Sequence, residues 1–120
     1  MAVLEAATRL LMAQGFTRRQ AVRALLPLTR QTLDNFERIG PRAAWTGPMT
    51  RGDFSTVQRH VDALSGFPPE YQDAYKVLSR LAAAVVSDDS NALLQKLDSI
   101  FGPRPKGAEE KKVRKKSAAG

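Results

Sequence analysis

The sequence contains no cysteine, which excludes disulfide bonds, thiol nucleophiles and cysteine-ligated zinc. It contains a single histidine, His60, with neither a second histidine nor a carboxylate at ligand spacing. Metal sites in proteins need several such ligands on one surface. We therefore expect no bound metal.

Long apolar segments are also missing. No apolar run approaches the roughly 20 residues that a membrane-spanning helix requires. Residues 1–5 have no basic segment ahead of their apolar residues and carry an early acid, Glu5, which is not typical of a signal peptide. We therefore expect a cytoplasmic protein with no membrane contact.

Strand signals are absent as well. No segment alternates apolar and polar residues, and the residue pairs that form tight hairpin turns do not occur. Apolar residues instead recur at helical spacing. They predict helices over residues 2–14, 18–39 and 54–65, a fourth that starts at Pro68-Pro69, and a short fifth that ends before Gly102. The predicted fold is an all-α five-helix bundle over residues 1–101.

Local signals mark the ends of the first helices. Gly15 is placed to end the first helix in a left-handed conformation. Thr17 and Gln20 have the spacing of a capping box at the start of the second. Pro27 predicts a kink or a short break inside the second helix, because proline lacks an amide donor. Gly40-Pro41 predicts the end of that helix.

The net charge of +7 is unevenly distributed. Residues 102–120 hold seven basic and two acidic residues, a balance of +5, which leaves 7 − 5 = +2 for the other 101 residues. The tail is rich in Pro, Gly, Lys and Ala and has little apolar surface to bury. We expect residues 102–120 to form a disordered basic tail that binds nucleic acid weakly and without sequence preference.

The composition of the residues from Thr46 to Thr56 predicts that a chemical site, if the chain has one, lies in this stretch. Gly47-Pro48 and Gly52 exclude a continuous helix. Asp53 or Ser55 is placed to cap the next helix. A helix N-terminus beside the arginine of this stretch, Arg51, favours binding of a carboxylate or phosphate.

Each polar residue near this loop also has an interpretation without a ligand. Asn35 and Thr32 lie on an otherwise apolar row of the second helix, and both side chains can simply bond to backbone or water. Asp53 can pair locally with Arg51. His60 can be a structural or solvated histidine, or a proton donor that lines a pocket.

The central part of the chain resembles a known helical domain. The matching stretches are Leu25-Leu26-Pro27-Leu28, Thr32-Leu33-Asp34-Asn35, Gly40-Pro41 and Thr46-Gly47-Pro48-x-x-Arg51-Gly52-Asp53-x-x-Thr56-Val57-x-x-His60. The chain resembles, over roughly residues 1–86, the C-terminal helical domain of uncharacterised Rossmann-like proteins, a domain-of-unknown-function family. That family is placed in the 6-phosphogluconate dehydrogenase C-terminal-like group, with ketopantoate reductase and pyrroline-5-carboxylate reductase.

This resemblance implies a function for the loop. In that group a Rossmann domain binds NAD(P), and the helical domain supplies dimer contacts and much of the substrate pocket. The residues implied at the pocket are Asn35, Thr46, Gly47, Pro48, Arg51, Thr56 and His60, with Asp53 as the helix cap. Arg51 would hold the carboxylate of a small substrate. No catalytic residue is assigned.

The sequence lacks the cofactor-binding half of such an enzyme. No G-x-G-x-x-G motif and no strand to precede it are present, so we expect no cofactor in this chain and no activity without a Rossmann domain. We expect a fragment, either a truncated gene product or one whose true start lies upstream. Its apolar helix faces predict a homodimer or a Rossmann domain as partner.

Two other functions remain open from the sequence. One is a small helical protein that binds nucleic acid or an acidic partner through residues 111–116. The other is a purely structural dimerisation module.

Overall fold

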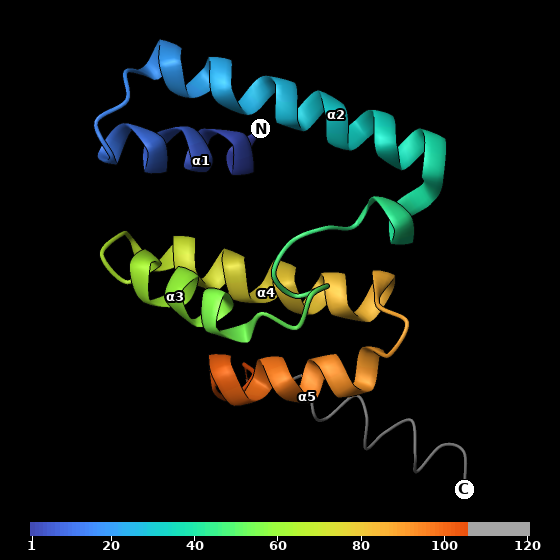
Figure 1. Ribbon diagram of the computed structural model, residues 1–120. Helices are drawn as coiled ribbons and strands as arrows, with labels where there is room; N and C mark the ends of the chain where they lie inside the picture. Colours follow the sequence, from blue (N-terminus) through green and yellow to red (C-terminus); the bar gives the residue numbers. More distant parts are fainter. Residues whose placement is uncertain (106–120) are drawn as a thin grey trace, which may run out of the picture. The chain divides into compact units, whose positions relative to one another are not determined.

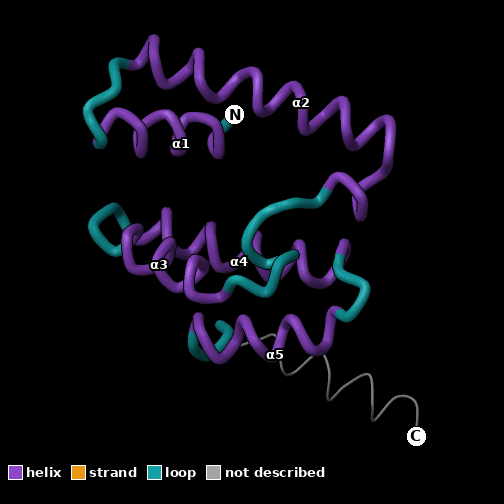
Figure 2. The backbone as a smooth tube through the Cα atoms, in the orientation of Figure 1, coloured by secondary structure: helices purple, strands orange, loops and turns teal. Residues whose placement is uncertain are grey.

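The computed structural model describes residues 1–105, and every regular element among them is a helix (Figures 1 and 2). The predicted all-α class with five helices is confirmed. The disordered tail predicted from residue 102 falls largely on residues 106–120, which lie outside the described residues. No described helix combines the length and apolar character needed to cross a membrane. The helices are α1 (Ala2–Ala13), α2 (Arg18–Ala44), α3 (Phe54–Leu64), α4 (Pro69–Val86) and α5 (Ser90–Phe101).

The chain divides into two compact units, Met1–Ala74 and Tyr75–Gly120, and α4 runs across the boundary. The first unit contains α1, α2, α3 and the start of α4. The second contains the rest of α4 and α5. Each unit is described by itself below.

Helices α1 and α2 form an antiparallel hairpin (Figure 1). Gly15, at φ 100°, permits the left-handed turn after α1 that its position predicted. The capping box at the start of α2 is also confirmed, because the Gln20 amide donates to Thr17 Oγ1 at 3.1 Å and the Thr17 amide donates to Gln20 Oε1 at 2.9 Å. The two local signals therefore fix where one helix ends and the next begins.

The short break predicted at Pro27 is wrong, because α2 keeps helical dihedral angles through this residue, whereas the alternative of a kink stays a prediction. The fixed φ of proline is itself helical, so its cost is a lost hydrogen bond and crowding of the preceding turn. Contacts between α1 and α2 stabilise the part of the helix before it. The only non-helical residue within α2 is Gly40 (φ 81°, ψ 169°), as Gly40-Pro41 predicted, and a further turn to Ala44 follows it.

In the first unit, one side of α3 is buried, and α3 forms a hydrogen bond with α4. Val57 and Val61 are its buried residues. The side chain of Gln72 donates to the carbonyl oxygen of Val61 at 2.8 Å, and the rings of Phe67 and Tyr71 lie 5.4 Å apart. These contacts hold the start of α4 against α3.

The second unit has a small core between α4 and α5. Its fully or nearly buried residues are Ser79, Ala83, Leu97 and Phe101. The rings of Tyr75 and Phe101 meet edge to face, with centroids 6.2 Å apart. This aromatic contact joins α4 to α5 near the end of the latter.

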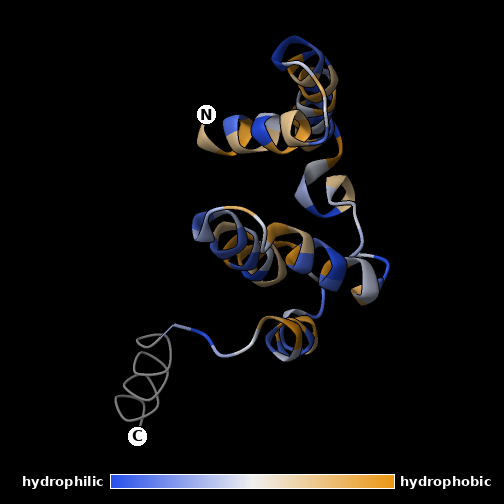
Figure 3. Cartoon of the chain, turned by 90° about the vertical axis from the view of Figure 1, so that its left-hand side faces the viewer, coloured by the Kyte–Doolittle hydropathy of each residue, from blue (hydrophilic) through white to orange (hydrophobic). Residues whose placement is uncertain are grey.

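Helix α2 extends far beyond the residues that α1 covers. At 1.5 Å per residue the part of α2 before Gly40 spans about 33 Å, whereas the 12 residues of α1 span about 18 Å. Apolar and polar residues are interspersed along α2 (Figure 3). Its second half exposes four large apolar side chains, Leu28 (67%), Leu33 (63%), Phe36 (59%) and Ile39 (46%).

Candidate functional site

The loop between α2 and α3 closes on itself before α3 begins. The amide of Asp53 donates to the carbonyl oxygen of Pro48 at 2.8 Å, and the amide of Gly52 donates to that of Met49 at 3.3 Å. This pair of bonds around a left-handed glycine (Gly52, φ 68°) is the Schellman arrangement that ends helical turns. The loop is therefore one capped helical turn, with a fixed backbone.

A hydrogen bond within the loop also holds the part that follows α2. The hydroxyl of Thr50 donates to the carbonyl oxygen of Gly47 at 2.7 Å. Gly47 has φ 115°, a conformation that other residues rarely adopt. Thr46 is exposed, whereas Gly47 and Pro48 are half-buried. These three predicted site residues lie together at the entrance to the loop.

Asp53 caps α3, as the sequence predicted. Its carboxylate accepts from the Thr56 amide at 3.2 Å, from the Thr56 hydroxyl at 2.7 Å and from the Ser55 hydroxyl at 3.0 Å. The hydroxyl bonds from Thr56 and Ser55, followed by the amide bond, lower the pKa of Asp53 below its ordinary value. The start of α3 therefore already has a carboxylate in place, which leaves it poorly suited to hold a second anion by itself.

Arg51 is the one predicted anion-binding side chain that stays available. Its side chain is exposed, and none of the other residues among 1–105 forms a hydrogen bond or ion pair with it. Its charge makes a small contribution to the lowered pKa of Asp53. Arg51 and Asp53 therefore do not form the direct pair that the sequence allowed. They attract each other only weakly and over a longer distance.

Thr56 and Asn35 are already engaged with side chains of their own helices. The Thr56 hydroxyl, besides donating to Asp53, accepts from the guanidinium of Arg59 at 2.9 Å. The side-chain oxygen of Asn35 accepts from Gln31 at 3.0 Å and from Arg38 at 3.2 Å. A substrate would have to compete with these bonds.

The structure brings the loop residues together, but the side chain of Asn35 forms its hydrogen bonds with Gln31 and Arg38 and none with the loop among residues 1–105. The Thr32 hydroxyl donates to the carbonyl oxygen of Leu28 at 2.9 Å, which confirms its interpretation as a backbone-bonded residue. His60 is exposed on α3, one turn beyond Thr56. Its role in a pocket stays a prediction.

Sequence reasoning missed Arg59 as the second partner of Thr56. The signal was present, because residues three apart on a helix are neighbours on its surface. With Arg51 on the preceding turn, two guanidinium groups belong to this part of the chain. The charge of the loop and the first turns of α3 is therefore more positive than the loop motif alone indicated.

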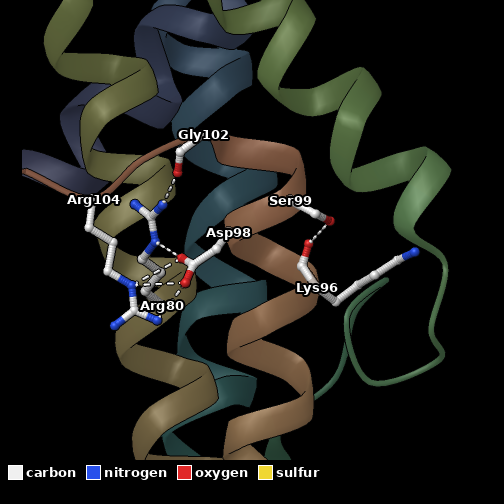
Figure 4. A network of polar contacts seen from close by, with 6 residues as sticks. All are labelled: Arg80, Lys96, Asp98, Ser99, Gly102 and Arg104. Atoms are coloured by element: carbon white, nitrogen blue, oxygen red, sulfur yellow. Dashed lines mark hydrogen bonds and ion pairs between the residues drawn. The ribbon is translucent and has the colours of Figure 1, made fainter.

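A second polar cluster lies in the other unit and is structural (Figure 4). Arg80 donates to the carboxylate of Asp98 at 3.0 Å and to the carbonyl oxygen of Gly102 at 2.9 Å, and its guanidinium lies 5.3 Å from the ring of Phe101. Arg104 donates to both carboxylate oxygens of Asp98, at 3.0 Å and 2.7 Å. Hydrogen bonds, first from Arg104 and then from Arg80, lower the pKa of Asp98. The cluster fastens residues 102–104 to α4 and α5.

No group of three or more histidine, cysteine or acidic residues with metal-binding geometry occurs among residues 1–105. No described residues identify a site for the predicted nucleic-acid partner, and NAD(P) was expected in a Rossmann domain rather than in this chain. The basic residues of that predicted nucleic-acid site, 111–116, lie outside the described part of the chain.

A family model described as a domain of unknown function, DUF2520, matches residues 1–97. The match covers most of the chain and extends past the roughly 86 residues of the predicted resemblance, so the chain belongs to this family. No curated protein and no solved structure matches the chain.

Proposed function

We propose that this member of the DUF2520 family is the C-terminal substrate-binding and dimerisation domain of a Rossmann-type, NAD(P)-dependent oxidoreductase-like protein. Residues 1–101 form this domain, of the 6-phosphogluconate dehydrogenase C-terminal-like type, and act in the cytoplasm. The nicotinamide cofactor, held by a separate Rossmann domain, supplies the hydride chemistry. The chain is inactive alone.

The uncovered half of α2 is the observation that carries this proposal. Leu28, Leu33, Phe36 and Ile39 are each between 46% and 67% exposed. A row of large apolar side chains along one helix is typical of a surface that another protein covers. A single exposed apolar side chain needs no such explanation, but four large ones on the second half of the same helix do.

A second copy of the chain is the partner that we propose for this row. The row lies along an extended helix. The same helix of another copy can therefore pack its ridges of side chains into the grooves between these side chains. A twofold pair of copies would bury both rows at once, which closes the assembly at two chains. The dimer would keep both substrate loops at fixed positions.

The loop after α2 supports the substrate-binding half of the proposal. The guanidinium of Arg51 is exposed and has no hydrogen-bond partner among residues 1–105. The Schellman turn and the Asp53 cap hold its backbone in one conformation. A guanidinium on a fixed turn can bind a carboxylate through paired, charge-assisted hydrogen bonds.

Sedimentation equilibrium over a range of chain concentrations tests the proposal. We expect the unaltered chain to form dimers, and Phe36→Asp to shift it to monomers, because burying a carboxylate in an apolar contact is costly. Arg30→Asp is the matched control: it places the same carboxylate at an exposed position about 120° around α2 from Phe36 and should leave the dimer intact. A chain that stays monomeric at every concentration, or loses its dimer equally with both substitutions, contradicts the proposal.

A further inference from the structure

The hairpin of α1 and α2 forms a partly open cavity of about 370 Å³ that is separate from the loop after α2. Its apolar lining includes Leu4 from α1 and Val22, Leu25 and Leu26 from α2. The three residues from α2 are spaced by three and one, so they lie on the same side of that helix. The cavity is thus formed entirely within the first unit.

The interior of this cavity presents apolar atoms. Thr8 also lines it and is 4% exposed. Its hydroxyl donates to the carbonyl oxygen of Leu4 at 2.8 Å, so its polar atom is satisfied inside α1. Cavities with such a lining accept hydrocarbon more readily than water.

The rim of the cavity carries charge. Glu5 and Arg18 line it, and Arg18 donates to both carboxylate oxygens of Glu5, at 3.1 Å and 2.7 Å. Arg9 donates to the same carboxylate at 2.9 Å. The side chains of these three residues, two guanidinium groups and one carboxylate, have a balance of +1. Each guanidinium keeps N–H donors that Glu5 does not use.

We propose that this cavity binds a small amphiphile with a single carboxylate and an aliphatic chain. The chain packs among Leu4, Val22 and Leu25, and the carboxylate accepts hydrogen bonds from Arg18 at the rim. The volume lies in the range of small-molecule pockets, which begins at about 300 Å³. The positive balance of the rim favours an anionic head group over a cationic one.

This site is distinct from the surface proposed for the second copy. That surface begins at Leu28, whereas the α2 residues that line the cavity end at Leu26. The inference therefore does not depend on the oxidoreductase-like function. Loss of the dimer by Phe36→Asp and loss of ligand by substitutions at the cavity are separate observations.

Isothermal titration of the full chain with decanoate, below its micelle concentration, tests the site. We expect one saturable site per chain. Arg18→Gln should weaken binding about tenfold or more, since a hydrogen bond to a charged group contributes about 1.5–3 kcal/mol. Arg23→Gln removes an exposed arginine of α2 that does not line the cavity, and should leave the affinity unchanged. Val22→Phe should weaken binding by narrowing the cavity.

Decyltrimethylammonium provides the comparison for charge, because it has the same chain length and the opposite charge. We expect it to bind much more weakly than decanoate. The proposal is overturned if decanoate shows no saturation, if Arg18→Gln and Arg23→Gln weaken it equally, or if the cationic amphiphile binds as tightly. Because Arg18→Gln changes only the rim, it tests the site even if Val22→Phe fails to fold.

Discussion

The carboxylate of Asp53 accepts two hydrogen bonds from Thr56, one from its amide at 3.2 Å and one from its hydroxyl at 2.7 Å. The amide of the same aspartate donates to the carbonyl oxygen of Pro48, at 2.8 Å. One residue thus closes the preceding turn and starts the next helix. The orientation of Arg51 on that turn depends on it.

Substitution of this cap should loosen the loop and the start of α3. We expect Asp53→Ala to lower the thermal midpoint by several degrees, because both Thr56 donors lose their acceptor. Asp53→Asn keeps an oxygen acceptor and should retain most of the stability. Circular dichroism melts of the three proteins check this. An unchanged midpoint in Asp53→Ala would show that the cap contributes nothing.

Acid should weaken the α1–α2 hairpin through Glu5. Hydrogen bonds from Arg18 and then Arg9 lower the pKa of Glu5 from 4.5 to about 2 in the folded chain. Because the folded pKa is the lower one, the stabilisation is fully present above pH 4.5 and is lost as the pH falls towards 2.

Glu5→Gln separates this effect from other carboxylates that titrate in the same range. The difference in urea midpoint between the unaltered chain and Glu5→Gln should be constant from pH 7 to about pH 5 and should shrink below pH 4.5. A difference that does not change with pH would mean that the ion pairs with Arg18 and Arg9 do not stabilise the hairpin.

Arg51 should affect substrate binding once the domain is joined to a cofactor domain. In such a two-domain protein, we expect Arg51→Ala to raise KM for a carboxylate substrate about tenfold or more, because a charge-assisted hydrogen bond is lost. Arg23→Ala, an exposed arginine near the start of α2, serves as the control and should leave KM nearly unchanged. Steady-state kinetics would measure both, and an equal KM in all three enzymes would remove Arg51 from the site.

The sequence predicted those features of the fold that depend on neighbouring residues. The capping box of Thr17 and Gln20, the glycine stop at Gly15 and the cap at Asp53 all act within a few residues. The short break predicted at Pro27 does not occur, and α2 stays helical there beside its contacts with α1. Tertiary contacts of this kind override a local signal.

The candidate site was predictable only in part, because local patterns do not indicate contacts between residues far apart in the sequence. The loop from Thr46 to Thr56 follows from its glycines and its cap. The partners of Thr56 and Asn35 also lie at helical spacing, and could have been found by listing polar residues three and four positions away. The bond from Arg80 to Asp98 joins residues 18 positions apart, and no local pattern indicates it.

Whether the exposed row of α2 is covered by a second chain is the central claim, and a spin label can test it directly. The chain has no cysteine, so Thr32→Cys, between Leu28 and Phe36 on this row, gives a unique labelling site. At concentrations where dimers form, electron paramagnetic resonance should show an immobilised nitroxide at this position. The same label at Arg30→Cys should stay mobile. Equal mobility at both positions in a dimeric sample would contradict the account.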